Sequence, residues 1–467
     1  MRILALDQGT TSTRGLLVDA RGGCRIVTAL RHTQHFPAAD RVEHDPAELL
    51  ANLRAVIDAA GPVDAIALSN QGESCLAWDA QTGAPLSRII VWQDRRTEAR
   101  LAKMAEAEAM VRARAGLPLD PYFSASKLAW LLETQPQVAE AHRTGRLRLG
   151  TTDAFFLQNL TGAALTDVTT ASRTSLMSLE TGSWDQDLCA LFGVPLECLP
   201  VIRATVSDFG RIGETPVTAA IVDQQAALYG HGCRAPGDAK ITFGTGAFAL
   251  ALAGETRPDL EGSGLLPTVA WRLGERTRYA SDGGVHAAGA AVEWALRVGL
   301  LDGPEALAAF DAVPAIDRDL AFVPALSGLA APHWDGSAAG LFIGMTGATT
   351  RDDLAQALIE GVALRAAEVV ERMGQTQGAI ERISVDGGLS RSEYLCQFLA
   401  DVTGAQIVLP GTEELTAYGA AQLAALGLGV KLPAPLPRAE ITPRACDRAA
   451  RMSRFSDAVT RARGWRQ

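Results

Sequence analysis

The chain has 467 residues, which is enough for roughly two to four domains that each bury a core of their own. It is 48% hydrophobic and 21% charged, as expected of a globular protein. The net charge of −10 argues against binding to nucleic acid or to an anionic membrane surface, because both attract basic patches.

The first part of the chain predicts the element order β-β-β-α-β. Strands are predicted at 2–7 and 13–20, where two apolar runs flank a polar turn, and a further β-rich run covers 24–36. An Asp-Pro pair begins a predicted helix over 45–61, in which apolar residues recur with helical spacing. The stretch 63–72 is again typical of a buried strand.

A related order recurs in the second half of the chain. A strand, a small turn and a strand are predicted within 238–254, and a further hairpin within 265–284. A helix over 286–301 and a long amphipathic helix over 352–374 follow. A strand and a helix within 381–404 complete the unit. The repeat predicts a duplicated α/β core.

This duplication predicts two domains, at residues 1–232 and 233–467.

The apolar stretch 417–430 is too short to span a bilayer and predicts a buried helix. Seven cysteines without CxxC spacing are typical of reduced thiols. Asp7 interrupts the first apolar run, so no signal peptide is expected and the predicted location is cytoplasmic.

Two small turns carry the first functional signal. "DQGTTST" (7–13) and "GTGAF" (244–248) each combine glycine with hydroxyl side chains, and such turns can direct successive N–H groups at phosphate oxygens. Each alone is equally consistent with a plain hairpin turn. Their equivalent places in a repeated unit favour a nucleotide clamped between two lobes.

Two further segments have both a functional and a structural interpretation. "DGGLSRS" (386–392) follows a strand, and its glycines allow contact with a planar ring or a ribose, although it is also consistent with a simple βα turn. Asp223 follows an apolar strand and precedes a predicted helix. It can accept a hydroxyl proton or hold a metal, or it can be a helix N-cap.

Several well-known signatures are missing from the sequence. It has no GxxxxGK[ST] phosphate loop, no GxGxxG and no GxSxG. "SASK" (124–127) formally fits SxxK, but its companions SDN and KTG are absent, so we interpret it as a chance match.

Taken together, these motifs resemble the FGGY family of carbohydrate kinases, and its glycerol-kinase branch most closely. The resemblance extends from residue 2 to about 430. Besides the segments quoted above, it includes "VEHDP" (42–46), "IVWQDRRT" (90–97), "DPYFSASK" (120–127), "TTDAFFLQNLTG" (151–162), "TDVTTASRTSL" (166–176), "VDQQAALYG" (222–230), "PALSGLAAPHWD" (324–335) and "ELTAYGAA" (414–421).

The resemblance implies an actin-like, ribonuclease-H-like α/β fold, with two β-β-β-α-β-based domains and a nucleotide cleft between them. It implies ATP and Mg²⁺, with Asp223 as the catalytic base and Asp7 as the residue that positions the metal. The implied nucleotide- and phosphate-binding residues are Thr10, Thr11, Arg14, Gly244, Thr245, Gly246, Gly387 and Gly388.

The resemblance also implies a polyol pocket with one departure from the family pattern. Glycerol kinases read Asn-Gln-Arg-Glu after the fourth strand, whereas this chain has "SNQGE" (69–73), with Gly72 in place of the arginine. Losing the guanidinium removes up to five hydrogen-bond donors and leaves Glu73 without that cation. The implied substrate residues are Gly72, Glu73, Trp92, Tyr122, Asp223, Gln224 and Phe248.

The expected function is ATP-dependent phosphorylation of a hydroxyl on glycerol or a related small polyol or sugar. Two explanations of Gly72 stay open: a four- or five-carbon polyol or ketose fills the vacated space, or glycerol remains the substrate and water or another arginine replaces the lost contacts. A different loop shape at Gly72, and a catalytically inactive sugar-sensing regulator, are further alternatives. The resemblance implies a homodimer or homotetramer; neither nucleic acid nor membrane insertion is expected.

Overall fold

The computed structural model describes residues 1–310 and 313–466. The described chain forms two compact units. Unit 1 comprises residues 1–232, 268–279 and 414–434, and unit 2 comprises residues 233–267, 280–413 and 435–467. The first long segment of unit 1 ends at the predicted limit of 232, and two later segments also belong to unit 1. Two domains with limits at 1–232 and 233–467 remain a proposal.

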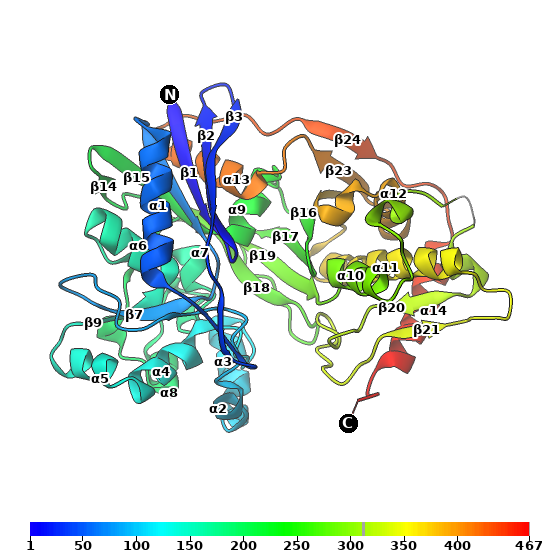
Figure 1. Cartoon of the computed structure of the whole chain (residues 1–467), viewed down its shortest axis with the longest axis horizontal. Coiled ribbons are helices and arrows are strands. Elements are labelled where there is room, and N and C mark those ends of the chain that lie inside the picture. Colours follow the sequence, from blue (N-terminus) through cyan, green and yellow to red (C-terminus); the bar gives the residue numbers. More distant parts are fainter. Residues whose placement is uncertain (311–312, 467) are drawn as a thin grey trace. The chain divides into compact units, whose positions relative to one another are not determined.

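Unit 1 is built on a six-stranded sheet with the order β14-β15-β6-β1-β2-β3 (Figure 1). β1 pairs antiparallel with β2 and parallel with β6, and β6 in turn pairs parallel with β15. The strands are β1 (Arg2–Gln8), β2 (Ser12–Asp19), β3 (Cys24–Arg31), β6 (Ala65–Asn70), β14 (Arg211–Ile212) and β15 (Thr215–Val222). The predicted β-rich run 24–36 divides into β3 and a separate strand β4 (His35–Ala38).

Both faces of this sheet are covered by helices. The bulky side chains of Leu4 and Leu6 share a core cluster with the apolar face of α1 (Pro46–Ala60). Asp45 caps that helix by accepting a hydrogen bond from the Ala47 N–H at 2.9 Å. Side chains alternate along a strand, so the small Ala5 faces the other side, where the alanine-rich helix α13 (Leu415–Gly427) contacts β1, β6 and β15. α13 is the buried helix predicted over 417–430.

The helices α9 (Asp223–Gly230) and α13 pack with their backbones in close approach. A Cβ on Gly419 of α13 would lie 2.0 Å from the carbonyl oxygen of Ala226, and a Cβ on Gly230 would lie 2.0 Å from that of Leu415. Each helix therefore requires a glycine at the crossing.

The remainder of unit 1 is a five-stranded sheet, β4-β5-β8-β7-β9, two small strand pairs and several helices. The additional strands are β5 (Arg41–His44), β7 (Cys75–Asp79), β8 (Ile89–Ile90), β9 (Leu147–Thr151), β10 (Leu165–Asp167), β11 (Met177–Ser178), β12 (Ser183–Trp184) and β13 (Val201–Arg203). The helices are α2 (Glu98–Ala102), α3 (Glu108–Ala115), α4 (Ser124–Thr134), α5 (Pro136–Arg143), α6 (Thr152–Thr161), α7 (Val168–Ala171) and α8 (Gln186–Phe192), with short 3₁₀ turns at Ala105–Ala107 and Leu196–Cys198.

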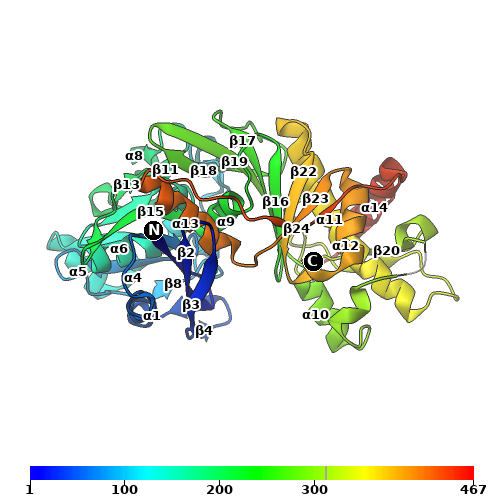
Figure 2. The ribbon, with the colours of Figure 1, turned by 90° about the horizontal axis from the view of Figure 1, so that it is seen from above.

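Unit 2 contains most of a seven-stranded sheet with the order β18-β19-β17-β16-β22-β23-β24, whose β18–β19 hairpin also supplies residues 268–279 of unit 1 (Figure 2). Its strands are β16 (Asp238–Phe243), β17 (Ala247–Gly254), β18 (Leu266–Leu273), β19 (Arg276–Val285), β22 (Arg382–Gly387), β23 (Gln406–Pro410) and β24 (Pro437–Ile441), beside a pair β20 (Ala321–Val323) and β21 (Leu341–Ile343). The helices are α10 (Gly289–Arg297), α11 (Arg351–Gln377), α12 (Glu393–Thr403) and α14 (Arg448–Ala462), with 3₁₀ turns at Pro304–Leu307, Ala315–Arg318 and Gly388–Arg391.

The two main sheets repeat one pairing scheme. β16 pairs antiparallel with β17 and parallel with β22, just as β1 pairs with β2 and β6. β22 pairs parallel with β23, which pairs antiparallel with β24, as β6 does with β15 and β15 with β14. The predicted duplicated α/β core is therefore confirmed. No helix within the described residues is both long and apolar enough to cross a membrane.

Replacing Gly419 with alanine tests the close helix crossing. The new Cβ overlaps the Ala226 carbonyl, so the helices must separate, and we expect the free energy of unfolding to fall by about 1–3 kcal/mol. Urea unfolding measures this loss. Gly374→Ala in α11 is the control, because no atom lies within 4 Å of the added Cβ, and stability should stay equal or rise slightly. Equal effects of the two variants would contradict the packing described here.

Candidate functional site

Three parallel strands of unit 1 end in one row. Gln8, Asn70 and Val222 are the last residues of β1, β6 and β15, and they are register partners across the sheet. The segments that follow them leave the same edge, and such an edge is where open α/β sheets place their ligands. These segments are the first glycine-threonine turn, residues 71–73, and the start of α9.

The first turn is a tight hairpin between β1 and β2. The Gly9 N–H donates to the Ser12 carbonyl at 3.0 Å, which leaves Thr10 and Thr11 at its tip. Arg14 lies opposite Asp7 in the β1–β2 register and forms an ion pair with Glu414 at 3.4 Å. The turn, a carboxylate and a cation are therefore neighbours.

Asp7 is held in an environment that disfavours its charge. Burial raises the pKa of its carboxyl to about 6, Arg14 opposes that shift, and Glu414 adds to it. The residue keeps part of its surface accessible at the end of β1. A carboxylate in this setting gains more than most from an added cation.

Glu73 follows the row and is fixed by two contacts. Arg173 Nε donates to its Oε1 at 2.7 Å, and both side chains are buried. The Ser124 hydroxyl donates to the Glu73 carbonyl at 2.8 Å and so holds a backbone with a φ of 60°. Glu73 has no arginine beside it at position 72, and an arginine from a distant segment, Arg173, pairs with it instead.

Trp92 and Tyr122 form an aromatic wall next to the first turn. Their ring centroids lie 5.4 Å apart, and Trp92 Nε1 donates to the Thr10 hydroxyl at 3.0 Å. The buried Lys127 ammonium donates to the carbonyls of Val91, Trp92 and Tyr122 at 3.0, 3.1 and 3.2 Å. Burial lowers the pKa of this lysine to about 8. Lys127, the last residue of "SASK", thus has a structural role in holding the aromatic wall.

Asp223 begins α9 directly after β15. Its Oδ1 accepts a hydrogen bond from the Gln224 N–H at 2.7 Å, and the N-cap position belongs to Val222. The partial positive charge of a helix N-terminus and this N–H both stabilise an ionised carboxylate. An anion at this place can accept a proton.

Unit 2 repeats the geometry of the edge. β16 and β22 end as register partners at Phe243 and Gly387, so the turn 244–246 and Gly388 leave the sheet together. A Cβ on Gly246 would lie 2.6 Å from the Val285 carbonyl oxygen. Packing within the fold is therefore enough to require glycine at this position. Phe248 lies on β17 opposite Thr242.

The glycines of unit 2 divide into two kinds. Gly387 has a φ of 89°, and a Cβ there would lie 2.2 Å from the Phe243 carbonyl oxygen, so the fold demands it. Gly388 has no atom within 4 Å of an added Cβ, and the nearest to Gly244 is at 3.9 Å. The fold leaves room for side chains at these two positions, which makes close approach of a ligand the better explanation for their glycines.

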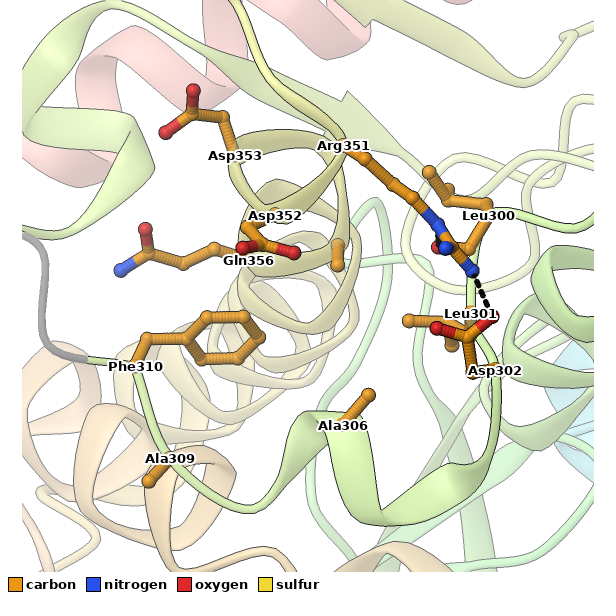
Figure 3. A pocket seen from close by; sticks show the side chains of 11 residues that line it. Leu300, Leu301, Asp302, Ala306, Ala309, Phe310, Arg351, Asp352, Asp353 and Gln356 are labelled. Atoms are coloured by element: carbon orange, nitrogen blue, oxygen red, sulfur yellow. Dashed lines mark hydrogen bonds and ion pairs between the residues drawn. The ribbon is translucent and has the colours of Figure 1, made fainter.

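A separate pocket in unit 2 contains none of the predicted site residues (Figure 3). Arg351 and Asp302 form an ion pair at 2.7 Å on one side of it, and Phe310 and Gln356 line another part. It lies beside the start of α11.

The structure thus groups the predicted residues by unit. Unit 1 holds Asp7, Thr10, Thr11, Arg14, Gly72, Glu73, Trp92, Tyr122, Asp223 and Gln224, and unit 2 holds Gly244, Thr245, Gly246, Phe248, Gly387 and Gly388. Sequence reasoning missed the contacts of Arg173, Lys127 and Val222. Arg173 lies within a quoted motif, "ASRT", but nothing in its spacing points to Glu73.

Comparison with known proteins gives matches along almost the whole chain. Residues 2–230 match the N-terminal domain, and residues 239–428 the C-terminal domain, of the FGGY family of carbohydrate kinases. A glycerol kinase from Alkalilimnicola ehrlichii is 43% identical over 99% of this chain and 98% of its own. A glycerol kinase from Thermus brockianus is 40% identical, and the match covers 100% of this chain and 99% of that protein. The crystal structure of Plasmodium falciparum glycerol kinase with ADP is 30% identical, has a TM-score of 0.92, and the match covers 99% of this chain and 98% of that one.

Asp7→Asn tests the cost of the buried carboxylate. A folded pKa of about 6, above the usual 3.8, means that the protonated form is stabilising below about pH 4 and that this contribution is lost as pH rises through 6. Asparagine imitates the protonated form. At pH 7.5 without divalent cations we expect the variant to be more stable by about 1–3 kcal/mol. Thermal unfolding from pH 4 to 8 measures the gain, and a gain that does not shrink towards pH 4 would contradict this assignment.

Proposed function

The chain belongs to the FGGY family of carbohydrate kinases, and from this premise we propose that it transfers the γ-phosphoryl group of ATP to a hydroxyl of a short polyol, with glycerol as the substrate. ATP is the phosphoryl donor that the family implies. The full-length similarity to glycerol kinases supports the choice of glycerol within the wider family.

One observation carries the proposal. The hydrogen bond from Trp92 Nε1 to the Thr10 hydroxyl at 3.0 Å connects the aromatic wall to the first phosphate turn. An apolar wall for a carbon skeleton and a turn for phosphate oxygens are therefore adjacent, as transfer between the two molecules requires. Glu73 follows the end of β6, which lies beside β1, and Asp223 follows the end of β15, which lies beside β6, so polar groups for hydroxyls leave the same edge.

We assign proton transfer to Asp223. The attacking hydroxyl of the polyol loses its proton as the new P–O bond forms, and the Asp223 carboxylate is the acceptor. The Gln224 N–H donates to that carboxylate and fixes its orientation at the start of α9. Glu73 accepts hydrogen bonds from the remaining hydroxyls, and Trp92, Tyr122 and Phe248 contact the carbon skeleton. Gln224, at the start of α9, completes the polyol-binding set.

The phosphates are assigned to both glycine-threonine turns. In unit 1, Thr10 and Thr11 offer hydroxyls and Arg14 offers a positive charge; in unit 2, Gly244, Thr245 and Gly246 offer backbone N–H groups. Gly387 and Gly388 are assigned to the adenosine. These roles require positioning and charge rather than covalent chemistry, which is typical of phosphoryl transfer.

The residues around Asp7 fit a magnesium ion. Mg²⁺ is usually held by one or two carboxylates together with water and phosphate oxygens, and Asp7 is a carboxylate that burial makes receptive to a cation. Among the described residues, three metal-ligand side chains converge at His142, Glu197 and Cys198 and not at Asp7. Mg²⁺ would neutralise phosphate charge, and Asp7 would hold it.

Asp223→Asn tests the proposed base. Asparagine keeps the size of the side chain but cannot accept the proton, so we expect kcat to fall at least about 100-fold while KM for ATP changes little. A coupled assay of ADP release measures both. Asp45→Asn, at the start of α1, is the matched control and should keep wild-type kcat. Wild-type turnover by Asp223→Asn would remove Asp223 from this role.

A panel of acceptors tests the substrate. It comprises glycerol, erythritol, both threitols, dihydroxyacetone and the common pentuloses and pentitols, each with ATP and Mg²⁺. We expect glycerol to give the highest kcat/KM. A four- or five-carbon compound that exceeds glycerol by a hundredfold would replace it as the substrate and leave phosphoryl transfer in place.

A further inference from the structure

Position 72 differs from the glycerol-kinase pattern, and the structure shows what occupies the space beside it. A Cβ on Gly72 would lie 2.8 Å from Val222 Cγ2, closer than carbon atoms approach in proteins. The Gly72 backbone is not in the left-handed region, so this valine is the obstacle to a side chain there. Val222 thus fills the space in which a side chain at position 72 would begin.

Val222 is also the residue directly before Asp223. It is 2% exposed, ends β15 opposite Asn70, and its N–H donates to the Thr169 hydroxyl at 3.0 Å. A shift of this valine therefore moves the start of α9. Packing at position 72 and the position of Asp223 are coupled through one side chain.

The cation beside Glu73 comes from a different part of unit 1. Arg173 follows α7, and its N–H donates to the Thr170 carbonyl at 3.0 Å. Its guanidinium carbon lies 5.4 Å from the centre of the Phe123 ring, while its Nε donates to Glu73 at 2.7 Å. The backbone hydrogen bond holds the main chain of Arg173, and the ring and the carboxylate hold its guanidinium.

A second cation near Glu73, the Lys127 ammonium, binds backbone carbonyls. Lys127 is buried and donates to three backbone carbonyls behind the aromatic wall. Its charge acts on Glu73 through space, and the hydrogen bond with the Glu73 carboxylate comes from Arg173.

We propose that Arg173 is the positioning residue that aims Glu73 at the polyol in this chain. We also propose a paired exchange of size at positions 72 and 222, in which the side chain of Val222 occupies the space beside Gly72 and keeps the pocket wall closed. Glu73 thereby has Arg173 as its charged partner, and Val222 occupies the space in which a side chain at position 72 would begin. Since that wall does not open, the substrate remains a three-carbon polyol. The inference rests on the proposed function and specifies its substrate class.

Arg173→Met tests the positioning role. Without the hydrogen bond to a charged partner Glu73 is no longer oriented, and we expect KM for glycerol to rise about 10- to 100-fold. KM for ATP should change less than twofold, and kcat less than KM for glycerol. Arg173→Lys keeps the charge but not the Nε geometry and should recover part of the loss.

Arg451→Met is the matched control for lost stability. Arg451 of α14 also has a buried guanidinium, with an ion pair to Asp317 at 2.6 Å and the Phe398 ring centre at 5.4 Å. It should lower the melting temperature as Arg173→Met does, and leave KM for glycerol within twofold. An Arg173→Met enzyme with KM for glycerol within threefold of wild type, or a similar KM rise in Arg451→Met, would overturn the positioning role.

A double-mutant cycle tests the paired exchange. Gly72→Ala should lower kcat/KM for glycerol about tenfold, because its Cβ displaces Val222 and with it Asp223. Adding Val222→Ala should restore most of the loss, and Val222→Ala alone should raise kcat/KM for erythritol relative to glycerol. Gly72→Ala with wild-type kcat/KM, or a wild-type preference for a four-carbon polyol, would overturn the exchange.

The outcomes distinguish failure of the inference from failure of the proposed function. If the wild-type chain phosphorylates glycerol and the Arg173 or Gly72 variants behave like wild type, the inference fails and the proposed function stands. If the wild-type chain phosphorylates no polyol of the panel, the proposed function fails, and the inference fails with it.

Discussion

The parallel pairing of β6 with β1 on one side and β15 on the other is the constraint on which the site depends. It aligns Gln8, Asn70 and Val222 in one row, so that three segments far apart in the sequence leave the sheet together. The core enforces this register. A slip by one residue would turn Leu4 and Leu6 away from α1 and place them against the closely packed α13, where the sheet presents alanines. Burial of apolar side chains therefore fixes the position of Asp223 relative to Asp7.

In unit 2, parallel pairing of β16 with β22 also aligns two strand ends, but different residues follow those ends. β16 and β22 end together, and Gly244 and Gly388 follow them, whereas Glu73 and Asp223 follow the ends of β6 and β15 in unit 1. An edge of backbone N–H groups suits phosphates and a flat ring, whereas an edge of carboxylates suits hydroxyls and a cation. Under the proposed function, one duplicated scaffold supplies two kinds of binding edge, and the residues after the strand ends determine the ligand of each.

Much of this was predictable from the sequence because the signals are local. Apolar periodicity predicts most strands of both main sheets, although not β14, β23 and β24, and the Asp-Pro pair predicts the start of α1. The two glycine-threonine turns and the strand before Asp223 follow from short segments as well. Other features depend on contacts that no local pattern records. The crossing of α9 and α13 requires Gly230 and Gly419 because each meets a carbonyl of the other helix, and the assignment of residues 414–434 to unit 1 follows from that packing.

The contact between Glu73 and Arg173 shows why a motif position misleads when it is considered alone. A buried ion pair contributes little net stability, because removing both charges from water costs about as much as their attraction returns. Its value lies in geometry: a guanidinium that packs against the Phe123 ring fixes the carboxylate that it touches. That effect depends on where the guanidinium lies in space and not on where it lies in the sequence. An arginine after α7 can therefore do the work of one beside Glu73, provided that the space beside Glu73 is filled. Val222 fills it, so the change at position 72 is compensated rather than lost.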